Sequence, residues 1–265
     1  MGSLVNDSRP ACIVTGGASG VGAATARFLA RQGYSVAVNH RKGREDAAER
    51  VVEDCRREGV DAVAVDADVS LDADCRRLAA ATLARFGRID ALVNSAATTQ
   101  FVSMQDLDAL NARDFERVFA VNTIGAYQMV RAVSDSIKHS HGAIVNVSSI
   151  AGSTGTGSSY AYSASKAALN SLTVALARNL APRVRVNAVV PGMIEGRWLR
   201  EGLGDEAYER TRLEFIKGSA LGRVCTAADV AGAIGWLITG TTVITGQLLV
   251  VDAGASLGKP PAVER

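Results

Sequence analysis

The sequence predicts an α/β protein built on a doubly wound parallel sheet with helices on both faces, and two observations lead to this fold class. Short apolar runs alternate along the chain with helical segments of ten residues or more, which is typical of parallel strands joined by right-handed crossovers. Runs such as AIVNV at 143–147 are almost wholly apolar, as strands covered on both faces are. With no linker or repeat in the chain, residues 1–265 are predicted to form a single domain.

The expected elements follow this rhythm from one end of the chain to the other. The first strand starts at Ala11 and leads through a glycine-rich turn into a helix that Gly33 closes. Later strands are expected at 35–39, 60–69, 89–97, 142–149, 183–190 and 246–252. Later helices are expected at 45–59, 71–87, 112–138, 160–181 and 226–239. A polar, irregular stretch from Pro191 to Arg223 interrupts the alternation.

Composition excludes several classes of function. The net charge is +2 and aromatic residues make up 5%, so we predict neither a nucleic acid partner nor a membrane surface. The apolar runs are shorter than a bilayer span and no signal-peptide pattern opens the chain, which indicates a cytoplasmic protein. The four cysteines are widely spaced and the three histidines are ungrouped. Reduced cysteines and no metal site are therefore expected.

Tyr162 and Lys166 form the most suggestive chemical pair. They stand four residues apart at the head of a helical run, so they share one face. An ammonium one turn away favours the phenolate and lowers the phenol pKa, which suits acid–base work. The preceding strand ends in two hydroxyls, Ser148 and Ser149, that could hold a carbonyl. Alone the pair is weak, because a half-buried Tyr beside a solvated Lys would give the same pattern.

The glycine-rich turn points to a dinucleotide. It follows the first strand, opens the first helix and carries the spacing Gly-x-x-x-Gly-x-Gly. Such a turn lets the backbone approach a pyrophosphate at a helix N-terminus. A tight turn without a ligand is the alternative, and the strand–turn–helix context argues against it. The residues predicted to bind the cofactor here are Thr15, Gly16, Ser19, Gly20, Val21 and Gly22.

Together with Ser149, thirteen residues before Tyr162, these motifs resemble the short-chain dehydrogenase/reductase family, and the resemblance covers nearly the whole chain. In its general sequence character the chain looks most like the 3-oxoacyl-[acyl-carrier-protein] reductase branch of that family. The resemblance implies a Rossmann-like fold with Tyr162 as the proton donor to a carbonyl. It implies that Lys166 lowers the Tyr pKa and holds the nicotinamide ribose, and that Ser149 bonds the substrate oxygen. It also implies that Asn122 interrupts a helix and holds a water for proton relay.

The end of the second strand bears on the choice of cofactor. An acid there would bond a ribose 2′-hydroxyl and repel a 2′-phosphate, but the sequence reads Asn39-His40-Arg41. The planar guanidinium of Arg41 suits a phosphate, so NADP(H) is predicted over NAD(H), although a solvated Arg would look the same. The resemblance implies further cofactor contacts at Asp68, Val69, Asn94, Ala96, Pro191, Gly192 and Ile194.

Two positions depart from the family pattern. The residues of the segment expected to cover the site do not identify the substrate. Ala97 stands where Gly is usual and Gly196 where Thr is usual. Residues 193–223 are expected to form a mobile lid over the site, with Trp198 and Phe215 packing the lid. Arg197 and Arg212 are expected either to meet an acidic carrier or phosphate, or to be solvated. The resemblance also implies a homotetramer through the 112–138 helix, the Tyr162 helix and the C-terminal segment.

The sequence therefore favours an NADPH-dependent reductase that converts a 3-oxoacyl thioester, or another small-molecule ketone, to a secondary alcohol. Two other classes stay open. One is a cofactor-binding sensor or scaffold without turnover, and the other is a non-redox lyase or epimerase on the same fold.

Overall fold

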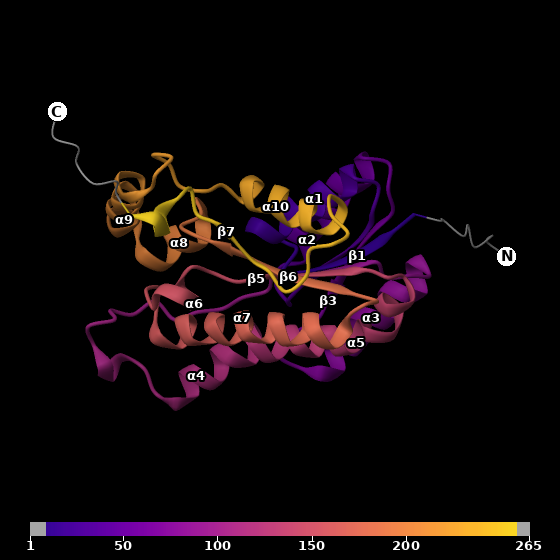
Figure 1. The fold of residues 1–265 in the computed structure, drawn as a ribbon, viewed down its shortest axis with the longest axis horizontal. Helices are drawn as coiled ribbons and strands as arrows, with labels where there is room; N and C mark the ends of the chain where they lie inside the picture. The colour runs from indigo at the N-terminus through magenta and orange to yellow at the C-terminus, as the bar shows by residue number, and fades with distance from the viewer. Residues whose placement is uncertain (1–8, 259–265) are drawn as a thin grey trace.

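The structure is a computed structural model that describes residues 9–258. Its strands form one seven-stranded sheet in the order β3-β2-β1-β4-β5-β6-β7, and every neighbouring pair is parallel. Helices cover both faces, with α1, α2 and α10 on one side and α3, α5 and α7 on the other (Figure 1). The predicted doubly wound sheet is confirmed. The chain changes direction between β1 and β4, the kind of switch point at which such sheets bind ligands.

The element bounds agree with the predicted rhythm. The strands are β1 Ala11–Thr15, β2 Ser35–His40, β3 Ala62–Asp66, β4 Ala91–Asn94, β5 Ala143–Val147, β6 Arg185–Pro191 and β7 Leu248–Val251. The α-helices are α1 Gly20–Arg31, α2 Glu45–Arg57, α3 Asp72–Phe86, α4 Ala112–Phe119, α5 Ala126–His139, α6 Ala151–Thr154, α7 Tyr160–Leu180, α8 Arg197–Leu203, α9 Asp205–Gly218 and α10 Ala227–Thr239.

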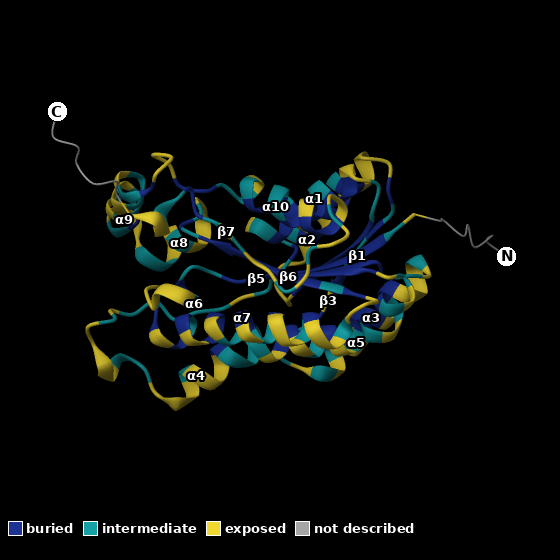
Figure 2. Ribbon diagram, in the orientation of Figure 1, coloured by how far each residue is buried: buried dark blue, intermediate teal, exposed yellow. Residues whose placement is uncertain are grey.

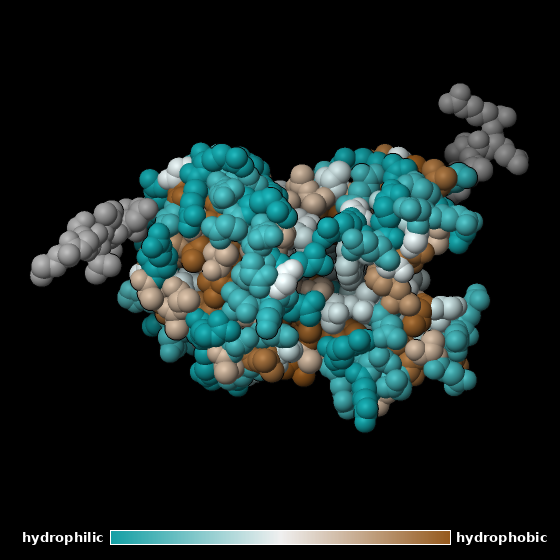
Figure 3. All heavy atoms as spheres, turned by 180° about the vertical axis from the view of Figure 1, so that it is seen from behind, coloured by the Kyte–Doolittle hydropathy of each residue, from teal (hydrophilic) through white to brown (hydrophobic). Residues whose placement is uncertain are grey.

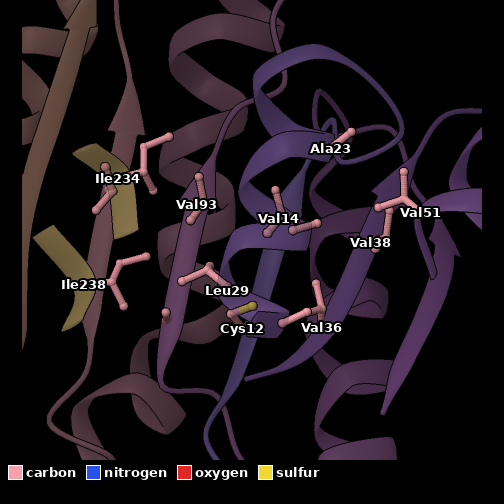
Figure 4. Packing of buried hydrophobic residues seen from close by; sticks show 14 of the residues in the cluster. Cys12, Val14, Ala23, Leu29, Val36, Val38, Val51, Val93, Ile234 and Ile238 are labelled. Atoms are coloured by element: carbon pink, nitrogen blue, oxygen red, sulfur yellow. The ribbon is translucent and has the colours of Figure 1, made fainter. Parts of the chain in front are cut away.

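The sheet lies between two apolar cores. Side chains alternate along a strand, so Cys12 and Val14 of β1 pack toward α1, α2 and α10 while Ile13 packs toward α3 and α5. Figure 4 shows the first core, where Leu29 of α1 and Ile234 of α10 lie over the strands. The strands are mostly buried between the helix layers (Figure 2). This double cover explains why the strands read as continuous apolar runs.

Two segments depart from regular α-helix or from their predicted form. The helix expected over 112–138 is interrupted by a π-helix, Ala120–Gly125, between α4 and α5, and this segment contains Asn122, where the resemblance implied an interruption. The stretch expected to be irregular forms α8 and α9, which meet at Gly204 with a left-handed φ of +79°. Both helices expose most of their surface; within α8 no residue is buried and within α9 only Tyr208 is. They therefore lack the broad apolar stripe by which a helix is read from sequence.

Within residues 9–258, no helix is long and apolar enough to cross a bilayer. Over the same range, no group of three His, Cys, Asp or Glu side chains could hold a metal ion. All four cysteines are buried and none forms a disulfide.

Candidate active site

The four predicted catalytic residues come from three elements. Tyr162 and Lys166 lie in the first two turns of α7, Ser149 follows β5, and Asn122 lies in the π-helix. The Ser149 side chain hydrogen-bonds to the Tyr162 phenol. Lys166 is buried, its Nζ donates to the carbonyl oxygen of Val147 at 2.8 Å, and it lies 5.6 Å from the centre of the Tyr162 ring. A phenol, a hydroxyl and an ammonium thus meet beyond the carboxyl end of β5.

The pKa of Tyr162 lies above its ordinary value. Burial raises it to about 12, and the hydrogen bond from Ser149 only partly opposes that rise. Burial lowers the pKa of Lys166 to about 8. Burial thus moves both pKa values away from their charged forms, because loss of solvent disfavours each charge, and the lowering of the phenol pKa by Lys166 stays a prediction. Near neutral pH the phenol is protonated and can donate a proton.

Asn122 holds the site together through its side chain. Its Nδ2 donates to Thr98 O and to Ser165 Oγ, both at 2.9 Å, and its Oδ1 accepts from Thr98 N at 2.8 Å. Ser165 Oγ in turn donates to the backbone oxygen of Tyr162 at 2.7 Å. The predicted interruption of the helix at Asn122 is confirmed. Its bonds tie the loop after β4 and the first turn of α7 to the π-helix.

Sequence reasoning missed two serines of this network. Ser159 is the N-cap of α7, and its Oγ accepts the backbone N–H of Tyr162 at 3.2 Å. A Ser directly before a helical run is a recognised start signal, so Ser159 could have been found. Ser165 lies inside the helix, where its partners come from distant parts of the chain and leave no local pattern.

The glycine turn is packed so closely against its own chain that two of its glycines admit no side chain. Gly16 has a left-handed φ of +62°, and a Cβ there would lie 2.9 Å from Cα of Ala96. A Cβ on Gly22 would collide with the carbonyl of Gly16. Ser19, the N-cap of α1, makes no side-chain cap bond, so the first N–H groups of α1 are not capped by it. A helix N-terminus of this kind favours a phosphate.

Open space adjoins this turn. A groove of about 800 Å³ reaches Ser19 and Gly20, with walls from α1, α2 and the start of α10. The space-filling view from behind shows the surface hollowed at its upper edge (Figure 3). A second, smaller crevice brings together residues that the sequence predicted separately. It is lined by Thr15, Val69, Asn94, Ala96, Val121, Asn122, Gly125 and Ala126.

Several predicted cofactor residues also hold the edge of the sheet in shape. Thr15 Oγ1 accepts the backbone N–H groups of Ser95 and Ala96 at 3.0 and 3.1 Å. Asn94 Nδ2 donates to Asn146 Oδ1 at 2.9 Å, while its own buried Oδ1 has no partner. Asp68 Oδ1 accepts from the backbone and the hydroxyl of Ser70. These contacts fix the loops after β1, β3 and β4.

The end of β2 holds two buried polar residues, Asn39 and His40, followed by the exposed Arg41. Asn39 is buried, its Oδ1 accepts Gly16 N at 3.2 Å, and its Nδ2 donates to Ala67 O at 2.9 Å. His40 is buried as well, with Nδ1 3.2 Å from Arg41 O. Arg41 is exposed. Arg41, the residue predicted to suit a phosphate, is therefore the exposed one of these three residues.

The comparisons with known proteins agree with this geometry. A family model described as enoyl-(acyl carrier protein) reductase matches residues 16–256. A protein assigned as ketoacyl reductase 2 of the granaticin polyketide synthase, from Streptomyces violaceoruber, is 38% identical over 249 residues, which cover 94% of this chain and 96% of that protein. A solved structure assigned as a short-chain dehydrogenase/reductase, from Burkholderia xenovorans, is 41% identical with a TM-score of 0.88, covering 95% of this chain and all of the other.

The chain belongs to the short-chain dehydrogenase/reductase family. It is an oxidoreductase that uses NAD(P) and acts on CH–OH and C=O groups. The solved structure of NAD⁺-bound xylitol dehydrogenase is also similar, with a TM-score of 0.81 and 28% identity over 92% of this chain and 98% of the other. Relatives of this short-chain dehydrogenase/reductase thus include both a reductase and a dehydrogenase.

In this short-chain dehydrogenase/reductase, the two ends of the segment predicted to form a lid are paired with each other. After Pro191 ends β6, Gly192 lies so close to Asp252 that a Cβ on it would meet that residue at 2.8 Å. Ile194 forms a parallel bridge with Cys225, at the other end of the lid. Cys225 N donates to Met193 O at 3.0 Å. Residues 193–223, the segment predicted to form a lid, are thus closed into a loop by a short pairing at their base.

The side chains of the lid only partly follow prediction. Arg197 pairs with Glu201 at 3.2 Å, and Arg212 pairs with Glu195 at 3.0 Å, so both cations have partners within the lid. Phe215 packs in the apolar cluster of the lid, as predicted. Trp198 differs from the prediction, because its ring lies against the rings of Phe101 and Tyr162. No local pattern in the sequence pairs these rings.

Proposed function

We propose that this protein is an NADPH-dependent reductase that converts the ketone of a 3-oxoacyl thioester, or a related ketone, to a secondary alcohol, with Tyr162 as the proton donor. The observation that carries the proposal is the meeting of Tyr162, Ser149 and the buried Lys166 beyond the end of β5, with Lys166 Nζ 5.6 Å from the centre of the Tyr162 ring. The name of the Streptomyces relative supports a ketoacyl substrate. The family also includes dehydrogenases, and the reductive direction is supported by the ketoacyl reductase names of the relatives.

The residues at the sheet edge fit a nicotinamide dinucleotide. Gly16 and Gly22 occupy places where a Cβ would fill the turn, and with Ser19 and Gly20 they would hold the pyrophosphate at the start of α1. Bound there, the cofactor supplies the hydride. Lys166, buried beside Tyr162, would hold the nicotinamide ribose.

The proton is supplied by the chain itself. Ser149 donates a hydrogen bond to the carbonyl oxygen of the substrate, and Tyr162 gives that oxygen its proton as negative charge develops on it. The cation of Lys166 stabilises the phenolate left behind. Asn122 and Ser165 hold the first turn of α7, so the phenol keeps its place relative to Ser149.

A Tyr162→Phe variant tests the proton donor. NADPH oxidation is followed with a panel of 3-oxoacyl thioesters, ketones and diketones. We expect kcat to fall on the order of a hundredfold or more, the usual range for loss of a positioned acid. Tyr34→Phe is the matched control, since Tyr34 is a half-buried tyrosine between α1 and β2 whose pKa burial also raises to about 12, and it packs on the first core. Equal turnover in Tyr162→Phe and wild type would overturn the proposal, and cofactor binding without any turnover would favour a sensor or a lyase.

The preference for NADPH is supported by charge at the end of β2. Arg41, Lys42 and Arg44 are exposed within four residues of one another, and β2 ends in Asn39 and His40 without a carboxylate. A 2′-phosphate would meet cations and no repelling acid there. Dissociation constants for NADPH and NADH measure the preference, and tighter binding of NADH would contradict it.

We also infer that the protein works as a homotetramer in the cytoplasm. Apolar side chains are exposed on several elements: Phe115, Ile124, Tyr127 and Val174 on α4, the π-helix, α5 and α7, Trp236 on α10, and Leu248 and Val250 on β7. Exposed apolar patches of this kind favour association. The four unpaired cysteines are consistent with a reducing compartment.

A further inference from the structure

Three aromatic rings form a row between the lid and the proton donor. The ring centre of Trp198, on α8, lies 5.7 Å from that of Phe101 at an interplanar angle of 65°. It lies 6.2 Å from that of Tyr162 at 53°. Trp198 keeps 47% of its surface exposed, so the indole is not part of a closed core. The lid therefore places one open indole beside the phenol that donates the proton.

Gly202 makes this arrangement possible. It lies one helical turn after Trp198 on α8, hence on the same face. A Cβ at Gly202 would lie inside the van der Waals surface of the Phe101 ring, close to three of its carbon atoms. The φ of Gly202 is not in the left-handed region, so glycine is needed here for space and not for backbone conformation. The Phe101 ring fills the notch that the missing side chain leaves.

The loop that carries Phe101 is fixed to the helix that carries Tyr162. Val102 N donates to Ser158 O at 3.1 Å, just before α7 begins. Tyr160 OH donates to Met104 O at 2.7 Å. Phe101 is thus held in place relative to Tyr162, and the position of Trp198 depends on how α8 docks onto Phe101.

The lid itself is built as one unit. Arg200 of α8 bonds Asp205 and Glu209 of α9 at 2.8 and 2.7 Å, and its guanidinium stacks 4.3 Å from the ring centre of Tyr208. The lid also has an apolar cluster separate from the two cores of the sheet. Its members are Met193, Tyr208, Val224, Leu199, Leu203, Phe215 and Ile216. These contacts tie α8 and α9 to each other, and both join the sheet through the short pairing of Ile194 and Cys225.

We propose that Phe101 and Trp198 form an aromatic clamp on the group next to the reacting carbonyl, and that Gly202 is the notch through which the lid closes the clamp. The proposal rests on the proposed function for the carbonyl at Tyr162, and adds how the substrate is selected. The rings of Phe101 and Trp198 lie at 65° to each other, and 47% of the surface of Trp198 stays exposed. Such a wall stacks well on a flat apolar group.

The clamp predicts a class of substrate. A ketone with an aryl or polycyclic substituent on the reacting carbon should be preferred over one with a flexible alkyl chain. An aryl group loses no internal freedom against the rings, whereas an alkyl chain must be ordered. The preferred substrates are then aromatic 3-oxoacyl thioesters.

The closing of the lid is tested without turnover. In a Trp236→Phe background Trp198 is the one remaining tryptophan, and acrylamide quenching of its fluorescence reports its exposure. Gly202→Ala is expected to raise the quenching constant toward that of the unfolded chain. Gly218→Ala, in the same lid, is the matched control because a Cβ there meets nothing within 4 Å. Phe101→Ala should raise the quenching constant by itself, and adding Gly202→Ala to it should raise the constant little further, which would show that the ring and the notch act as a pair. Equal quenching constants in Gly202→Ala and Gly218→Ala would contradict the proposal that Gly202 leaves space for the Phe101 ring.

Selection is tested with the N-acetylcysteamine thioesters of benzoylacetate and 3-oxohexanoate, which differ in a phenyl or a propyl group on the reacting carbonyl. Wild type should show the higher kcat/KM for the phenyl substrate. Trp198→Leu should reduce that preference about three- to tenfold, the range for one lost aromatic pair. If both thioesters are reduced and the ratio of their kcat/KM values does not change in Trp198→Leu, the aromatic clamp is contradicted. The proposed reductase activity is then still supported. If wild type reduces no carbonyl, the proposed function fails, and the quenching experiment alone decides whether the notch closes the lid.

Discussion

Tyr162 and Lys166 each lose solvent in the folded chain, and the two burials act in opposite directions on their pKa values. The phenol stays neutral to about pH 12, which suits an acid, and the ammonium loses its proton near pH 8. Above pH 8 Lys166 loses its positive charge, so it can no longer stabilise a Tyr162 phenolate. We therefore expect the reductive direction to be favoured near neutral pH.

Lys166 gives a signed prediction for stability against pH. Its pKa is about 8 when folded, against an ordinary value of 10.5, so between these values the unfolded chain binds more protons and the folded state gains stability as pH rises. Because buried thiols also titrate above neutrality, the quantity to measure is the free energy of unfolding of wild type minus that of Lys166→Met, from urea titrations. This difference should rise by about 2 kcal/mol in favour of wild type between pH 7 and pH 10.

A control removes a cation that burial does not affect. Lys217 is exposed on α9, and the difference between wild type and Lys217→Met should stay nearly constant over the same range. A constant difference for Lys166→Met as well would mean that Lys166 does not titrate in the folded chain, and it would contradict the burial argument.

At the scale of elements, α8 begins at a residue that departs from the family pattern. Gly196 is the N-cap of α8 in extended backbone, with φ of 162°, and it forms no side-chain cap bond. A Cβ there would meet nothing within 4 Å. A Thr would therefore fit without strain, and its hydroxyl could accept an N–H of the first turn of α8 or reach a cofactor.

Gly196→Thr is accordingly expected to strengthen both the helix and cofactor binding. A new N-cap is worth about 1 kcal/mol, measured as a rise in the free energy of unfolding. A restored hydrogen bond would tighten the Kd for NADPH about fivefold. Gly196→Ala separates the causes, since it removes the freedom of glycine without adding a hydroxyl. If Ala matches Thr in both measurements, the hydroxyl plays no part.

The elements that the sequence predicted correctly carry a local signal in their residue types, and the features that it missed carry none. β1 and β5 are apolar along their whole length because both faces are covered, and the glycine turn carries its backbone constraint in its residue types. α9 pairs its charges with one another and buries Tyr208 alone, so its sequence looks like a solvated loop. The contacts of Ser165 and Trp198 join distant segments. Only tertiary structure brings those groups together.

The whole molecule leaves one face of its edge strand uncovered. Along β7, Leu249 and Val251 pack on the core under α10, whereas Leu248 and Val250 are 38% and 49% exposed on the opposite face. In Figure 2 the helix layers cover the central strands more fully than this end of the sheet. An open edge with apolar residues is a surface that proteins normally cover or charge. In the proposed tetramer, a second copy of the chain would cover it.

Val250→Lys tests whether this edge joins subunits. A buried Lys with no partner at a contact between copies is costly, so sedimentation velocity should show species smaller than those of wild type. The subunit itself should keep its fold, measured by circular dichroism, because Val250 is half exposed in the single chain. Leu83→Lys is the matched control: Leu83 lies on α3 with 37% of its surface exposed, and the same change there should leave the sedimentation coefficient unaltered. If Val250→Lys sediments as wild type does, the β7 face is not an interface, and the exposed residues of α4, α5 and α7 become the surface that holds the copies together.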